Sequence, residues 1–190
     1  TLPVAVRLNS SEDIVVLFEG DGSVRKFDRK GQQTVMLQPG VIKHPSDIAI
    51  NNNDTLFVAS KSNGLVYKVK SDTEIVIIAG NARGITAAMD GVLASDSYLG
   101  EPVSIDFDIS NRLYIADNSF GAIRVVTPDG IISSLTDNEN KVFNISKMRV
   151  NNHNQTTLYT SHMLEHKINR IKYQIFAKES RFSYVHYPLF

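Results

Sequence analysis

The sequence contains no cysteine, and its charges cancel, with 20 lysine and arginine residues against 20 aspartate and glutamate residues. The absence of cysteine excludes a disulfide framework and thiolate metal sites. Balanced charge without a basic stripe gives no means of neutralising phosphates, so we expect no nucleic-acid partner. No apolar run is long enough to predict a membrane span. No P-loop or dinucleotide-binding fingerprint occurs either, and we expect no cofactor.

What the sequence does contain is a repeated pattern of short strand-like segments. Each copy has a first apolar segment, then three more that are rich in β-branched and aromatic residues and separated by turn residues. The first segments are PVAVRLN from Pro3, PSDIAIN from Pro45, PVSIDFD from Pro102 and ISKMRVN from Ile145. No segment shows a sustained helical period. Successive copies are roughly 43 residues apart except before the third, and this length is typical of a repeated β-unit.

A repeated unit of four antiparallel strands is typical of a β-propeller blade, a twisted sheet whose two faces are buried by its neighbours. We therefore predict an all-β fold, with residues 1–190 forming a single β-propeller domain or propeller segment of about four four-stranded blades. The expected blades cover 1–40, 41–80, 98–137 and 143–190, and 81–97 is expected to be an inter-blade loop. Closure at four blades is one alternative. We favour part of a larger ring or arc, because unpaired blade edges and faces need a partner.

The third copy carries the most specific motif. It reads as a glycine-rich turn, an Asp-Gly step, a small residue, an apolar residue and proline, then LYIAD, a turn and IR-V. The matching positions are Gly84, Asp90, Gly91, Ala94, Leu99, Pro102, 113–117, Ile123, Arg124 and Val126. In these residues the chain resembles the NHL-repeat family of β-propellers, which commonly close with six blades. The match fades in the second copy and is only a pattern in the first and fourth.

The innermost strand of each propeller blade lines the central channel, so its polar residues are the first candidates for a ligand site. Charged side chains alternate with apolar ones along these segments, as expected for strands. The channel candidates are Arg7, Asp47, Asp106, Lys147 and Arg149. Their mixed signs suit either a polar ligand funnel or mutual neutralisation across blade contacts, and both interpretations stay open.

Two further sets of residues could carry chemistry near the turns. Asp117 is interpreted as an acceptor for turn N–H groups, with a calcium ligand as the alternative. The string HMLEH resembles a zinc-protease motif, which needs a helix to place both imidazoles on one face. Because the repeat places this string in a hairpin turn, we disfavour the protease. His162 and His166 are kept only as candidates for a metal or surface site.

Four N-x-S/T sequences predict glycosylation, and with it an extracellular or cell-surface location. The asparagines are Asn9, Asn53, Asn144 and Asn154.

The function favoured by these features is a non-enzymatic protein-interaction or assembly module, a scaffold that binds a protein partner or copies of itself through open propeller edges or rim loops. The alternative implied by the NHL resemblance is a metal-dependent lyase or hydrolase with its site in the central channel. The inner segments contain no histidine, which counts against that alternative. RNA binding, known for some NHL proteins, is disfavoured by the zero net charge.

Overall fold

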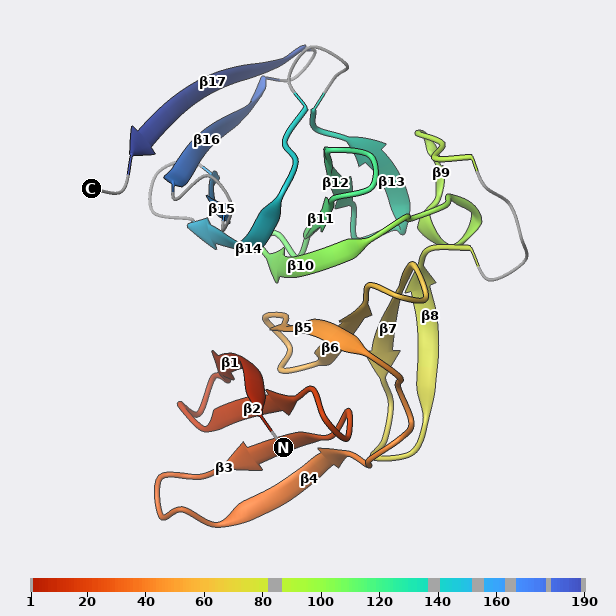
Figure 1. Ribbon diagram of the computed structural model, residues 1–190, viewed down its shortest axis with the longest axis vertical. Coiled ribbons are helices and arrows are strands. Elements are labelled where there is room, and N and C mark those ends of the chain that lie inside the picture. The colour runs from red at the N-terminus through yellow and green to blue at the C-terminus, as the bar shows by residue number, and fades with distance from the viewer. Residues whose placement is uncertain are drawn as a thin grey trace.

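The computed structural model describes residues 2–81, 87–136, 141–151, 156–162, 167–176 and 179–188. In these residues the chain forms four antiparallel sheets arranged as a four-blade β-propeller, which confirms the predicted fold class (Figure 1). In every blade four successive strands pair in chain order, which makes an antiparallel meander. None of the described segments forms a helix long and apolar enough to cross a membrane.

Each blade begins with an innermost strand and ends with an outermost one. The first blade contains β1 (Pro3–Leu8), β2 (Ile14–Phe18), β3 (Val24–Phe27) and β4 (Gln33–Leu37). The second contains β5 (Pro45–Ile50), β6 (Leu56–Ser60), β7 (Leu65–Val69) and β8 (Ile75–Ala79). The third contains β10 (Pro102–Phe107), β11 (Leu113–Asp117), β12 (Ala122–Val126) and β13 (Ile131–Ser134). The fourth contains β14 (Ile145–Asn151), β15 (Thr157–His162), β16 (Lys167–Phe176) and β17 (Glu179–Pro188).

The stretch 81–97, which we expected to be a loop between blades, also contributes structure to the third blade. It contains the short strand β9 (Val92–Leu93) and the 3-10 turn η1 (Ala94–Asp96). β9 pairs antiparallel with β13 and makes the third sheet five-stranded. Arg124 of β12, which is almost fully buried, donates to the Met89 carbonyl at 2.7 Å and to Asp90 at 2.8 Å. Arg124 therefore fixes the segment around Met89 and Asp90 against the third blade.

Apolar clusters between successive blades hold the propeller together. One cluster joins the first and second blades, including Leu17 and Ile48, and a second joins the second and third blades, including Val66 and Ile105. A third cluster joins the third and fourth blades around Met148. Because each middle blade packs against a neighbour on either side, its strands are apolar on both faces, and all five residues of β6 are buried.

The first and fourth blades do not close the ring onto each other. The innermost strands contact one another in the series β1, β5, β10 and β14, but among the described residues no comparable contact joins β14 to β1. Figure 1 shows the two end blades apart, on the side of the propeller opposite β8 and β9. The molecule is therefore an open arc of four blades.

A β-bulge occurs at the same place in all four innermost strands. In each case the register with the second strand shifts between the first and third residues, as between Pro45 and Asp47 or between Pro102 and Ser104. A bulge leaves one residue unpaired and re-aims those that follow. It sets the direction of the third residue, which is Asp47, Ser104 or Lys147 in the last three blades.

Candidate functional site

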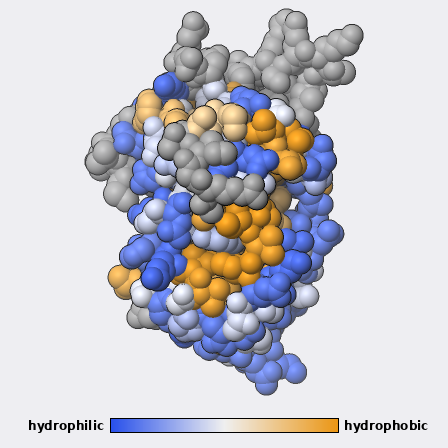
Figure 2. Space-filling view, turned by 90° about the vertical axis from the view of Figure 1, so that its right-hand side faces the viewer, coloured by the Kyte–Doolittle hydropathy of each residue, from blue (hydrophilic) through white to orange (hydrophobic). Residues whose placement is uncertain are grey.

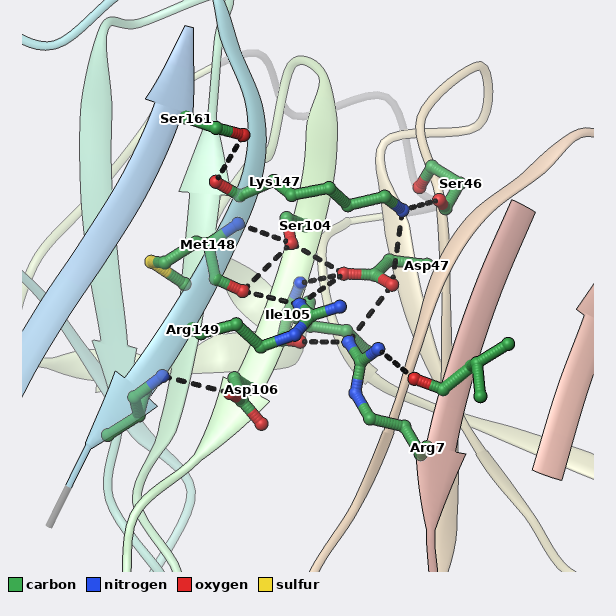
Figure 3. Close-up of polar contacts among 12 residues, drawn as sticks. Arg7, Ser46, Asp47, Ser104, Ile105, Asp106, Lys147, Met148, Arg149 and Ser161 are labelled. Atoms are coloured by element: carbon green, nitrogen blue, oxygen red, sulfur yellow. Dashed lines mark hydrogen bonds and ion pairs between the residues drawn. The ribbon is translucent and has the colours of Figure 1, made fainter. Parts of the chain in front are cut away.

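The predicted channel residues of different blades meet at the propeller axis (Figure 3). Asp47 of β5 is their shared partner. Arg7 of β1 lies 3.0 Å from Asp47 Oδ1, Lys147 of β14 lies 3.2 Å from the same oxygen, and Arg149 lies 3.5 Å from Oδ2. One carboxylate from the second blade therefore binds cations from the first and fourth blades.

The third blade completes this arrangement through a serine and its backbone. Ser104 of β10 donates its hydroxyl to Asp47 Oδ2 and accepts the Met148 N–H at 3.0 Å, while the Ile105 N–H donates to Asp47 at 3.2 Å. Arg7 also donates to the Ile105 carbonyl at 3.3 Å. All four blades thus contribute to one network. We call it the axial cluster: Arg7, Asp47, Ser104, Asp106, Lys147 and Arg149.

Asp106 lies in the same channel but binds backbone N–H groups, whereas Asp47 binds cationic side chains. Its carboxylate accepts the Val150 N–H at 2.9 Å and the Phe107 N–H at 3.0 Å. It therefore joins the third blade to the fourth through backbone groups. Burial raises the pKa of Asp106 above its usual value, and the backbone donors and nearby arginines oppose this only in part.

The pKa of Asp47 moves in the opposite direction. Burial by itself would raise it, but the charges of Arg7, Lys147 and Arg149 outweigh burial and hold the pKa of Asp47 below its usual value. Burial lowers the pKa of Lys147. Asp47 is therefore ionised at neutral pH, and both of its carboxylate oxygens are already bound by cations and by N–H or O–H donors, which does not suit acid–base work.

The exposed side of the axial cluster is cationic. The side chains of Arg149 and Lys147 are 42% and 34% exposed, whereas Arg7 is 10% exposed and Asp47 is not exposed at all. The geometry supports the neutralisation interpretation directly, because each cation reaches Asp47. A ligand funnel at this place stays a prediction.

Ser104 was not among the residues that we selected from the sequence. The repeat contains the missing signal, because Ser104 occupies the third position of its innermost strand, as Asp47 and Lys147 do in theirs. Charge alone does not mark a neutral serine among charged equivalents, although a hydroxyl that both donates and accepts is suited to join two blades.

The last residue of the second strand has a recurring structural role. Asp117 is buried and accepts the N–H groups of Gly100 and Glu101 at 2.8 and 2.9 Å and that of Ser119 at 3.2 Å. The prediction that it binds backbone N–H groups is confirmed. At the same position in the second blade, Ser60 donates to the Lys43 carbonyl at 2.9 Å. In both blades this residue fixes the segment that leads into the innermost strand.

His162 takes this same position in the fourth blade. It is buried, and its Nδ1 lies 2.9 Å from the Phe143 carbonyl, while Nε2 lies 2.8 Å from Asn169 and 3.0 Å from Thr160. Both ring nitrogens are thus occupied within the protein, which does not suit a metal ligand. His166 lies outside the described residues. Over the described ranges, no group of three or more His, Asp or Glu side chains is arranged to hold a metal ion.

The four candidate glycosylation asparagines differ in their surroundings. Asn53 and Asn144 are exposed. The side-chain nitrogen of Asn9 donates to Asp13 at 3.1 Å, and its oxygen accepts two turn N–H groups. Asn154 lies outside the described residues. Attachment of a glycan to any of them stays a prediction.

One face of the first blade is apolar and open to solvent. Val6, Leu8 and Ile14 are 53%, 62% and 46% exposed. The second-blade residues at the positions of Val6 and Ile14 are Ile48 and Leu56, which are 0% and 3% exposed because the first blade covers them. We call the face formed by Val6, Leu8 and Ile14 the incoming flank, since in the second blade the same face receives the preceding blade.

Comparison with known proteins supports the β-propeller fold and goes no further. The chain matches no protein-family model, so NHL membership in particular is not confirmed. No curated protein matches its sequence.

Several solved propeller structures do superpose on the chain. Virginiamycin B lyase from Staphylococcus aureus matches 98% of this chain and 55% of its own, with 14% identity and a TM-score of 0.60. A gluconolactonase from Xanthomonas campestris matches 91% of this chain and 58% of its own, with 14% identity and a TM-score of 0.67. A chain of the nidogen–laminin complex matches 90% of this chain and 75% of its own, with 10% identity and a TM-score of 0.61. The chain thus spans about half the length of the lyase.

Proposed function

We propose that this chain is a non-enzymatic protein-interaction module whose incoming flank receives a further propeller blade. The observation that carries the proposal is the contrast between equivalent positions. Val6 is 53% exposed, but Ile48, Ile105 and Met148, which stand at the same place in the other blades, are fully buried. A sheet face with this apolar pattern is normally covered. The length of the lyase beyond the part that this chain matches is consistent with a ring that has further blades.

The chemistry of the two open faces indicates what kind of blade would bind. The incoming flank is apolar, whereas the open face of the fourth blade includes Lys147, Arg149 and Ser161. Joining the fourth blade of one copy to the first blade of another would bury cations against Val6. The expected occupant therefore has an apolar face like that of the first blade, where Ala5 and Leu17 are buried against the second.

A duplicated blade tests this proposal without an unknown partner. A copy of residues 3–44 placed ahead of Thr1 supplies the face that already packs on the second blade, together with its natural linker. We expect it to raise the urea midpoint and to slow amide hydrogen exchange in β1 and β2 of the original first blade. Val6→Asp in the original copy should abolish both gains.

Leu93→Asp is the matched control, since Leu93 is 49% exposed but lies on β9 of the third blade. It should leave both gains intact. Light scattering of the unmodified chain adds a second readout: self-association that Val6→Asp abolishes would identify a second copy as the occupant. A monomer whose stability the added blade does not change would contradict the proposal.

The finer features belong to the same proposal. We assign the repeats to the NHL type on the motif between Gly84 and Val126, and we place the protein outside the cell, with glycans on the exposed Asn53 and Asn144. Production in a secreting eukaryotic cell should give a protein whose mass falls on treatment with an N-glycosidase. An unchanged mass would remove the argument for the location.

The alternative, a metal-dependent lyase or hydrolase, gains only fold-level support from the lyase and the gluconolactonase. The carboxylates that the structure describes at the propeller axis do not fit a metal centre. Both oxygens of Asp47 are bound by cations and N–H or O–H donors, and Asp106 is held by two backbone donors. A cation placed there would compete with three basic side chains.

A further inference from the structure

A cavity of about 360 Å³ lies between the second and third blades, away from the axial cluster. Its apolar walls come from both blades, and Phe57 and Phe107 meet there with ring centroids 4.8 Å apart. Figure 2 shows an apolar area bordered by hydrophilic residues on the side of the molecule where these two blades meet. The volume lies near the lower end of the range of small-molecule sites, about 300–1,000 Å³.

Among the described residues that line the cavity, Lys68 is the one ionisable side chain. The repeat shows what is unusual about it. In the first blade the equivalent Lys26 pairs with Asp13 at 3.1 Å, but in the second blade Thr55 stands at the position of that aspartate. Over the part of the chain that the structure describes, Lys68 makes no ion pair. An ammonium beside an apolar cavity without its counter-charge favours an anion.

Two asparagines, Asn51 and Asn111, line the same cavity as Lys68. The side-chain oxygen of Asn51 accepts the N–H groups of Asn53 and Thr55, both at 3.0 Å, and that of Asn111 accepts the Asn52 N–H at 3.1 Å. These bonds fix the orientation of both amides. Their NH₂ groups remain as donors, which suit carboxylate oxygens.

We propose that this cavity binds a small organic carboxylate with an apolar, preferably aromatic, body. The body lies against Phe57, Phe107, Leu113 and Val126, and the carboxylate faces Lys68 and the asparagine amides. The interface between the third and fourth blades lacks the corresponding lysine. Tyr114 stands there at the position of Phe57, is fully buried, and donates its hydroxyl to Asp108 at 3.1 Å. The carboxylate site is therefore specific to one of the blade interfaces.

A matched pair of probes tests the proposal: 3-phenylpropionate and the uncharged 3-phenylpropionamide. Titration followed by methyl NMR should shift the signals of Ile78, Leu113 and Val126 and leave those of Leu37 and Leu17 unchanged. We expect the acid to bind about five to ten times more tightly than the amide, because only the acid gains the charge-assisted bond. Equal affinity of the two probes, or shifts away from the cavity, would overturn the proposal.

Three variants separate charge from shape. Lys68→Met should remove the preference for the acid while retaining binding of the amide, and Lys70→Met, an exposed lysine two residues along, should change neither. Asn51→Asp retains the turn acceptor, as Asp108 does at the same position of the third blade, but brings a negative charge to the cavity lining. It should abolish acid binding. If Asn51→Asp proves unstable, Lys68→Met alone decides: an unchanged acid preference in that variant disproves the assignment.

Discussion

Replacing Asp47 by asparagine tests whether the axial cluster holds the four blades together. Asp47 is not exposed, and its nearest cation, Arg7, is only 10% exposed at 3.0 Å. With an effective dielectric constant of about 20, a pair at this distance attracts by about 5 kcal/mol, much of which offsets the cost of burying both charges. Lys147 and Arg149 add less than Arg7, since they are more exposed and water screens them in part.

The expected loss for Asp47→Asn is therefore about 3–4 kcal/mol of unfolding free energy, the usual cost of leaving a buried charge without its partner. Asp106→Asn in the same channel is the control. Its raised pKa shows that the charge of Asp106 is disfavoured in the folded protein, and asparagine can still accept the Val150 N–H. This variant should lose no more than about 1 kcal/mol.

Urea unfolding followed by far-ultraviolet circular dichroism measures both losses. A double-mutant cycle of Asp47→Asn with Arg7→Met should show a coupling energy above about 1 kcal/mol. Equal losses for Asp47→Asn and Asp106→Asn, or a loss for Asp47→Asn below about 1 kcal/mol, would refute the reasoning.

Ionisation of Asp47 and of Asp106 should change the folding stability in opposite directions as the pH rises. The pKa of Asp47 is lower in the folded protein than its usual 3.8, so its contribution to stability is present above that pH and is lost as the pH falls through the folded value. The pKa of Asp106 is raised, so its ionisation costs stability as the pH rises from 3.8 through the folded value. Asp47→Asn should reduce the acid sensitivity of the protein, and Asp106→Asn should remove the second effect.

Two further substitutions test the fold. Gly64 has a φ of +63°, and an added Cβ would lie 2.2 Å from the Leu99 carbonyl oxygen. Gly64→Ala should therefore lower the unfolding free energy by at least about 2 kcal/mol. Gly31→Ala is the control and should lower it by about 1 kcal/mol, because an added Cβ at Gly31 meets no neighbouring atom. Equal losses in urea unfolding would show that the close approach is wrong. Arg124→Met should lower the unfolding free energy by about 2–3 kcal/mol, because it removes the hydrogen bonds to Met89 and Asp90. It should also speed proteolysis of the segment around Asp90. An unchanged cleavage rate there would show that Arg124 does not hold this segment in place.

Much of the fold could be predicted because its signals are local and repeated. Alternating side chains marked the strands, and the nearly equal offsets from Pro3 to Pro45 and from Pro102 to Ile145 marked the blades. The convergence of Arg7, Asp47 and Lys147 followed from placing the first strand of each blade at the axis. Their pairing did not follow, since it depends on the bulges that aim each side chain.

The short strand at Val92 could not be predicted, because a two-residue strand has no periodicity and exists only by pairing with Ile131 and Ile132. His162 likewise is placed by packing. The sequence alone left it a candidate ligand, but contacts with the Phe143 carbonyl and with Asn169 on the paired strand β16 make it a buried structural residue.

The sequence by itself determined that this protein is all β, that it is built from four similar blades, and which polar residues stand on the innermost strands, because these properties depend only on neighbours along the chain. The tertiary structure alone decided which of those charges meet, which blade face stays open, and where a cavity forms beside Lys68. Each of these depends on how sheets distant in sequence lie against one another, and no local pattern records that.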